Sequence, residues 1–68
     1  MRTVEIDRVP VRLGQFVQLA GLADSGADAK RLIAAGAVAV NTAVETRRGR
    51  QLHRGDVVTV AGEDVTVG

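Results

Sequence analysis

The sequence predicts an α+β domain in which one strand is followed by two helices and then by three or four short strands. Two features support this fold class. Apolar residues recur at helical spacing over residues 13–20 and 29–33, whereas after Gly36 they alternate with other residues, which is typical of strands. Because 68 residues without a linker or repeat are enough for one small core, residues 1–68 are predicted to form a single domain.

The first strand and the first helix are predicted from the N-terminal third. Residues 3–7 alternate polar and apolar side chains, which is the pattern of a half-buried strand at a sheet edge, and Pro10 marks the break that follows. One face of a helix is then formed by Leu13, Phe16, Val17 and Ala20. Gly21 is expected to end this helix.

A second helix is predicted to begin after Ser25. The Ser25 hydroxyl can accept a hydrogen bond from a free backbone N–H group at the start of the helix. The negative charge of Asp28, three residues later, is stabilised by the positive end of the helix dipole. The buried face is expected to contain Ala29, Leu32 and Ile33. Gly36 occupies the position at which a glycine commonly follows a helix.

The remaining strands are predicted from alternation and turn residues. Val38 and Val40 share one face of a strand, and Asn41 with Thr42 forms a plausible tight turn before Val44. Residues 54–56 are a second turn signal before the β-branched strand 57–60, and residues 62–64 are expected to turn into a last strand at 65–67.

Composition argues against several protein classes. The chain has no cysteine, so disulfides and thiolate metal sites are not expected, and a reducing compartment is favoured. The N-terminus lacks the apolar run of a signal peptide. The uncharged runs 13–23 and 32–44 fall short of the roughly 20 apolar residues that a membrane span needs. We therefore expect a soluble cytoplasmic protein with no membrane partner.

The net charge of +1 conceals an uneven distribution of charge. Residues 1–29 contain three basic and four acidic side chains, and residues 55–68 contain three acidic side chains and no basic one. Residues 30–54 contain six basic side chains and only Glu45 as an acid, which gives this segment a net charge of +5. A basic segment of this kind is typical of a nucleic-acid contact, although an ordinary solvated loop would look the same on charge alone.

Three stretches of the sequence resemble a known family. The first stretch, residues 24–41, includes Asp24-Ser25-Gly26-Ala27-Asp28. The second, residues 44–50, includes Thr46-Arg47-Arg48-Gly49-Arg50. The third, residues 55–58, is Gly55-Asp56-Val57-Val58. Together with Leu13-Gly14-Gln15-Phe16 they resemble the S-four RNA-binding domain, also called the alpha-L motif. The resemblance covers roughly residues 4–60 and is strongest to the short stand-alone bacterial proteins of this family.

The resemblance implies a fold and a partner. The implied fold has two packed helices against a small, mainly antiparallel sheet of three to five short strands, and it presents a basic groove to structured RNA such as ribosomal or transfer RNA. The resemblance implies that Lys30, Arg31, Arg47, Arg48 and Arg50 contact the RNA. We add two further cations, Arg12 and Arg54, to the predicted RNA-binding residues. Arg12 could equally be a plain surface residue, and Lys30 with Arg31 could simply balance the helix dipole.

Recognition is expected to depend on RNA shape and backbone. The guanidinium group matches phosphate oxygens with a planar fork of donors and stays charged at physiological pH. Base reading in RNA usually needs aromatic rings, but Phe16 is the only aromatic residue and its helical position marks it as core. No cofactor, metal or small-molecule substrate is predicted.

Three other functions are alternatives to RNA binding. A sulfur carrier of the ubiquitin-like class has this size, but it needs a C-terminal diglycine where this chain has Val67-Gly68. A protein-interaction module could dock on an acidic partner through the arginine-rich loop around residues 47–50, which we call the basic loop. An enzyme is not expected, because the chain has no cysteine or tyrosine, and its single histidine, His53, has no candidate nucleophile with a base beside it. Exposed edge strands would also permit self-association, so the sequence leaves the oligomeric state open.

Overall fold

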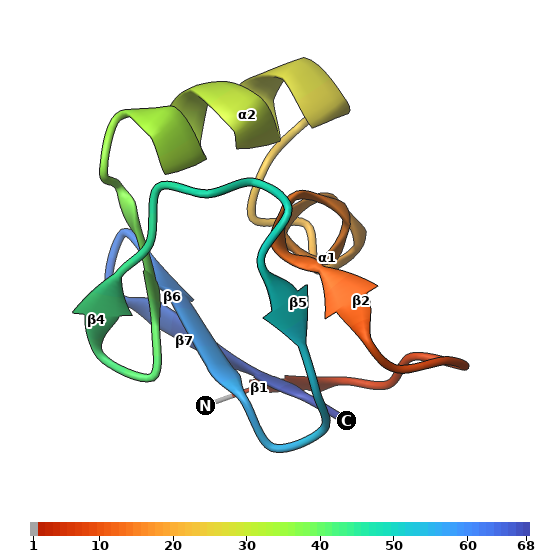
Figure 1. The fold of residues 1–68 in the computed structure, drawn as a ribbon. Helices are drawn as coiled ribbons and strands as arrows, with labels where there is room; N and C mark the ends of the chain where they lie inside the picture. Colours follow the sequence, from red (N-terminus) through yellow and green to blue (C-terminus); the bar gives the residue numbers. More distant parts are fainter. Residues whose placement is uncertain (1) are drawn as a thin grey trace.

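The computed structural model describes residues 2–68, and the arrangement within them confirms the predicted α+β class (Figure 1). In chain order the elements are β1 (Arg2–Val4), β2 (Val11–Arg12), α1 (Leu13–Leu19), α2 (Gly26–Ala34), β3 (Val38–Val40), β4 (Ala43–Val44), β5 (Gln51–Leu52), β6 (Val57–Val60) and β7 (Glu63–Val67).

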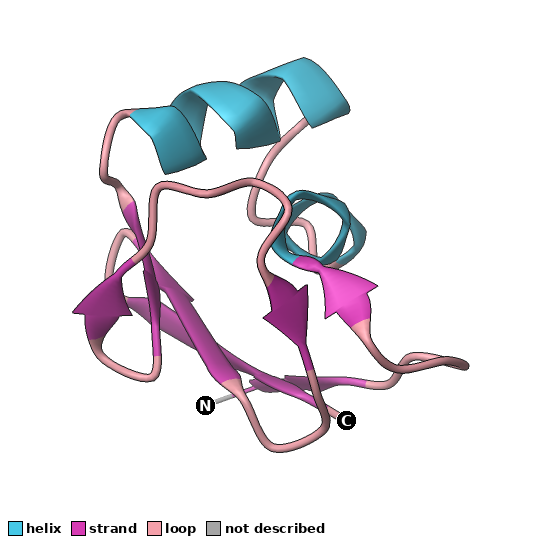
Figure 2. Ribbon diagram, in the orientation of Figure 1, coloured by secondary structure: helices cyan, strands magenta, loops and turns pink. Residues whose placement is uncertain are grey.

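The strands form two sheets (Figure 2). The larger sheet has the order β1-β7-β6-β3-β4, in which β1 runs parallel to β7 and the other neighbours are antiparallel. This confirms the mainly antiparallel sheet and places β1 at its edge, as predicted. The smaller sheet pairs β2 with β5, so that Arg12 lies opposite Gln51. This pair joins the start of α1 to the segment that follows the basic loop.

Both helices lie on one side of the larger sheet, with α2 across the top of the molecule and α1 beside β2 (Figure 1). The predicted faces of the helices are buried: Phe16 and Val17 of α1 and Ile33 of α2 are fully inaccessible. They pack against sheet residues that include Val38, Val58 and Val65, together with Leu52 from β5. The core therefore lies between the helices and the sheet, and Arg47 and Arg48 of the basic loop stay at the surface.

The ends of α2 follow the predicted capping pattern. Ser25 is the N-cap, and its hydroxyl oxygen accepts a hydrogen bond from the Asp28 backbone N–H at 3.1 Å. The Asp28 carboxylate accepts in return from the backbone N–H of Asp24 at 3.2 Å. This hydrogen bond, helped by Arg31, lowers the pKa of Asp28. Gly36 follows the helix with a φ of +78°, the left-handed conformation that favours glycine.

Two-residue turns close both hairpins of the larger sheet. Asn41 and Thr42 have φ angles of +50° and +73°, and Ala61 and Gly62 have +52° and +81°. Positive φ at both central residues defines a type I′ turn, whose twist matches that of the flanking strands. The Asn41–Thr42 turn was predicted from the sequence.

Strand boundaries differ from the predictions at three places. β1 stops at Val4 instead of continuing to Asp7, because its partner β7 ends at Val67 and leaves residues 5–7 without a strand to pair with. β7 begins at Glu63, since the turn is formed by residues 61–62 and not by 62–64. Five strands follow the helices where three or four were predicted, because two-residue strands such as β4 and β5 are too short to show alternation.

Candidate nucleic-acid interface

The basic loop between β4 and β5 is organised around the carboxylate of Glu45. This side chain is only 8% exposed. It accepts hydrogen bonds from the Arg47 backbone N–H at 3.1 Å, from Nε and Nη2 of Arg47 at 3.0 and 3.1 Å, and from Nη1 of Arg50 at 3.3 Å. The bonds from Arg47, with a smaller contribution from Arg50, lower the pKa of Glu45 to about 2. Glu45 is therefore an anion at physiological pH and fixes the direction of two arginines.

Backbone hydrogen bonds attach this loop to the start of α1. The N–H groups of Leu13 and Gly14 have no partner within the helix, and they donate to the carbonyl oxygens of Arg50 and Arg48 at 2.8 and 3.1 Å. The approach is close enough that a Cβ atom on Gly14 would lie 2.7 Å from Cγ of Arg48. A glycine at position 14 thus lets the Arg48 side chain lie directly against α1.

A hollow of about 360 Å³ lies where the basic loop meets the two helices. Its walls are formed by β2, α1, the first residue of α2 and the loop itself, and the lining residues are Arg12, Gly14, Gln15, Gln18, Gly26, Arg48 and Gly49. A neighbouring surface depression is lined by Arg47, Gly49, Arg50 and Gln51. Gly49 belongs to both, so the two depressions adjoin at the basic loop.

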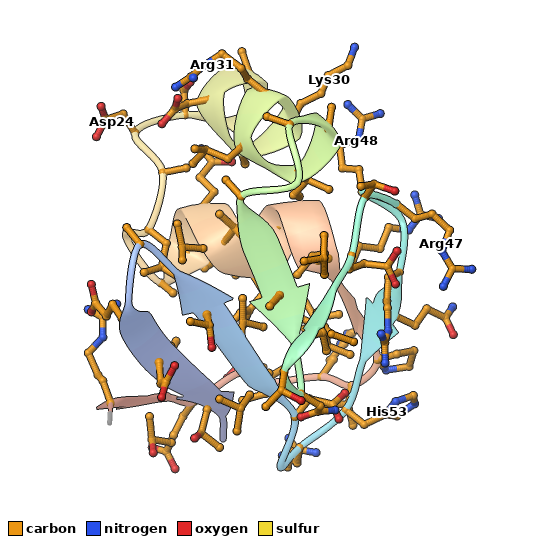
Figure 3. All side chains as sticks on the ribbon, turned by 90° about the vertical axis from the view of Figure 1, so that its left-hand side faces the viewer. Asp24, Lys30, Arg31, Arg47, Arg48 and His53 are labelled. Carbon is orange, nitrogen blue, oxygen red and sulfur yellow. The ribbon has the colours of Figure 1, made fainter. Side chains whose placement is uncertain are left out.

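Three of the predicted cations have free side chains. Arg12, Lys30 and Arg48 are exposed, and within residues 2–68 their side chains make no hydrogen bond or ion pair. Arg12 and Arg48 line the same hollow. In Figure 3, Lys30 extends from α2 on the same side as Arg48, with Arg47 below them. These cations can bind an anion without first breaking an internal contact.

Arg31 and Arg54 are placed differently. Arg31 forms an ion pair with Asp28 and lies on the other side of α2 from Lys30 in the view of Figure 3. Arg54 donates a hydrogen bond to the Ile6 carbonyl oxygen at 3.0 Å. Its turn, between β5 and β6, is at the end of the molecule opposite α2 (Figure 1). Arg47, Arg48 and Arg50 therefore belong to the basic loop and Arg12 lines a hollow with Arg48, whereas Arg31 and Arg54 are engaged in other contacts.

Sequence reasoning missed three residues of this surface. Glu45 entered the charge count only as an offset, although an isolated acid among arginines is a signal for an ion pair. Gln15 and Gln18 were noted only as lying off the apolar face of the first helix. Their position beside the basic loop depends on the β2–β5 pairing, which the sequence did not predict.

Within residues 2–68, the His, Asp and Glu side chains form no group of three or more that could hold a metal ion. His53 is exposed, and its backbone N–H donates to Asp56 at 2.8 Å, which together with Asn41 lowers the pKa of Asp56. None of the helices described is long and apolar enough to span a bilayer.

Val67 is buried in β7, and the backbone N–H of Gly68 donates to the Val4 carbonyl oxygen at 2.8 Å, so both residues are held against β1.

The chain was compared with protein families and with individual proteins. The family model described as S4 domain, the S-four domain of the sequence analysis, matches residues 4–68. A Bacillus subtilis protein named "Probable ribosome maturation protein RlbA" is 42% identical over 59 residues, which cover 87% of this chain and 83% of that protein. An Escherichia coli protein named "Putative RNA-binding protein YbcJ" is 41% identical over 68 residues, covering 98% and 97%.

A solved structure is similar as well. The solution structure of YbcJ from Escherichia coli matches with a TM-score of 0.74 and 41% identity, over 98% of this chain and 86% of that one. It is described as revealing an "alfaL motif involved in RNA-binding". The match agrees with the arrangement of two helices against a mainly antiparallel sheet.

Proposed function

Because the chain belongs to the S-four domain family, we propose that it binds structured RNA through the concave surface around the basic loop and catalyses no reaction on it. One observation supports the location above all others. Arg12 and Arg48 are free cations that line the hollow, and Lys30 extends on the same side of the molecule as Arg48 in the view of Figure 3. Arg47 and Arg50, whose directions Glu45 fixes, belong to the same loop as Arg48. We refer to Arg12, Lys30, Arg47, Arg48 and Arg50 as the cationic surface.

The cationic surface suits a phosphate backbone. Each arginine offers a bidentate fork of donors, and the lysine adds a point charge. Glu45 offsets part of the charge of Arg47 and Arg50, so about 3 to 5 phosphates would be neutralised. A plot of log binding constant against log salt concentration is then expected to have a slope of roughly −2 to −4. This is the salt dependence of a moderate binder that recognises backbone and shape.

Ribosomal RNA is the proposed partner. The Bacillus subtilis relative is named for ribosome maturation, and this chain matches 83% of its length. A small cationic module with no catalytic centre can act by occupying an RNA fold while it forms. Transfer RNA is the competing partner, and the same binding experiment compares the two.

The proposal is tested by a salt titration of binding to fragments of ribosomal RNA and to transfer RNA. The triple variant Arg47→Ala, Arg48→Ala, Arg50→Ala is expected to lose most of the affinity. Two single variants are compared. Arg48→Ala is expected to reduce the slope of log affinity against log salt concentration by about 1. Arg8→Ala removes an exposed arginine between β1 and β2 and is expected to leave this slope unchanged. Arg31→Ala and Arg54→Ala are expected to have smaller effects than Arg48→Ala.

Circular dichroism must show that each variant is folded. No binding by the wild type to either RNA at low salt would refute the proposal and favour docking of the basic loop on an acidic protein. Equal losses in Arg8→Ala and Arg48→Ala would mean that RNA binds, but not at the cationic surface.

A further inference from the structure

The hollow beside the basic loop contains groups that phosphate binding does not need. Gln15 and Gln18 are three residues apart in α1, so their side chains share one helix face, and both line the hollow with Arg12 and Arg48. Both glutamines are exposed to solvent. A phosphate offers only acceptors, whereas each glutamine amide presents a donor and an acceptor next to each other. The amides therefore match a different kind of ligand group.

The edge of a nucleobase is such a group. Bases carry neighbouring donors and acceptors, and a glutamine amide can pair with them through two hydrogen bonds. In RNA, bases are read mainly where they are unpaired and turned out of a helix, and an arginine guanidinium can replace an aromatic ring as the stacking surface. Arg12 and Arg48, whose side chains have no partner in the described chain, line the hollow and could supply such a surface.

The size and walls of the hollow fit one nucleotide. Its volume of about 360 Å³ is near the lower end of the roughly 300 to 1,000 Å³ of small-molecule sites, too small for a duplex but adequate for a single base and sugar. Glycines form part of the wall at positions 14, 26 and 49. A Cβ atom on Gly26 would be 3.5 Å from Oε1 of Gln18, so this amide lies directly over the start of α2.

We propose that the hollow receives one unpaired nucleotide of the RNA, whose base edge is hydrogen-bonded by the amides of Gln15 and Gln18 while Arg12 and Arg48 contact its base plane and the flanking phosphates. This inference rests on the proposed function and names the RNA feature that the site selects. It also departs from the expectation of recognition by shape and backbone alone, because the amides add a contact to one base.

The test compares RNA hairpins that differ at one position. One hairpin is fully paired, and four others carry a single bulged A, G, C or U at the same place. The wild type is expected to bind the best bulged hairpin about fivefold to a hundredfold more tightly than the paired one, the range given by one bidentate amide–base contact. Adenine is expected to be preferred, since its N6 and N7 present a donor beside an acceptor.

Variants assign the preference to the amides. In the double variant Gln15→Ala, Gln18→Ala, the affinity for the bulged hairpin is expected to fall to that for the paired hairpin. Arg8→Ala removes an exposed side chain between β1 and β2 that does not line this hollow, and it is expected to keep the preference. Thermal melting checks that the three proteins are equally folded.

The outcomes separate this inference from the proposed function. No binding to any hairpin at low salt refutes RNA binding at this surface altogether. Equal binding to the paired and all bulged hairpins leaves RNA binding intact but overturns the nucleotide subsite. A bulge preference that survives in the glutamine double variant also overturns it, whereas loss of the preference only in that variant supports it.

Discussion

Replacing Gly14 by alanine would move one arginine of the cationic surface while leaving the backbone in place. The added Cβ atom would lie 2.7 Å from Cγ and 3.3 Å from Cδ of Arg48, and the first distance is shorter than real contacts allow. Its distance to the Arg48 carbonyl oxygen would be 3.7 Å, an ordinary contact. The hydrogen bond from the Gly14 N–H to that oxygen can therefore persist, and the Arg48 side chain has to rotate away.

The structure sets the expected magnitudes. The Arg48 side chain is exposed and makes no hydrogen bond or ion pair within residues 2–68, so its rotation costs little free energy. Alanine in place of a helical glycine stabilises a helix by up to about 1 kcal/mol. The free energy of unfolding of Gly14→Ala is thus expected to stay within about 1 kcal/mol of the wild-type value. Loss of one phosphate contact is expected to reduce the salt slope of RNA binding by about 0.7 to 0.9.

A double-mutant cycle provides the assay. Urea unfolding measures stability, and salt titrations of RNA binding compare the wild type, Gly14→Ala, Arg48→Ala and the double variant. Because both substitutions remove the same contact, the double variant is expected to bind as Arg48→Ala does, within about 0.5 kcal/mol. Full RNA affinity in Gly14→Ala would refute the reasoning about Arg48, and a loss of several kcal/mol of stability would show that backbone packing is what requires glycine.

Three further predictions concern the frame that holds the surface. Glu45 has its pKa lowered from 4.5 to about 2 in the fold, so its carboxylate stabilises the protein above pH 4.5 and this contribution is lost as the pH falls towards 2. The difference in Tm between wild type and Glu45→Gln is therefore expected to shrink over that pH range, and a constant difference would contradict the pairing with Arg47 and Arg50. Leu52→Ala is expected to lower the free energy of unfolding in urea by about 2 to 5 kcal/mol, because Leu52 is fully buried. Leu19→Ala, at a site that is 66% exposed, is expected to change it by no more than about 0.5 kcal/mol. Equal effects of the two substitutions would show that β5 is not anchored in the core. Thr42→Gly is expected to raise the free energy of unfolding by about 1 kcal/mol, because a left-handed φ of +73° strains a β-branched residue, and a destabilised variant would rule out such strain.

Periodicity and capping predicted much of the fold. The buried faces of the two helices, the Ser25 cap and the β6 strand follow from local patterns, because each depends on residues that are neighbours in the sequence. The parallel pairing of β1 with β7 joins residues about 60 positions apart along the chain, and no local pattern specifies it. The β2–β5 pair was missed for a related reason, since two residues show no period.

The same contrast holds for the candidate site. Charge counting located the basic segment, but it treated every cation alike. The structure distinguishes free side chains such as Arg48 and Lys30 from Arg31, which is paired with Asp28, and from Arg54, which is bonded to Ile6. The Arg54 contact joins segments 48 positions apart, which no local pattern specifies, whereas the Arg31–Asp28 pair lies within α2 and its i,i+3 spacing could have indicated it.

RNA binding at the cationic surface can be observed directly on the arginine side chains. In NMR spectra of the ¹⁵N-labelled protein, each arginine contributes one Nε–Hε signal, and a structured ribosomal RNA fragment is added in steps. If RNA binds at the cationic surface, the signals of Arg12, Arg47, Arg48 and Arg50 shift or broaden first and those of Arg2 and Arg8 stay unchanged. Changes confined to Arg2 and Arg8, with the signals of the cationic surface unaffected, would contradict it.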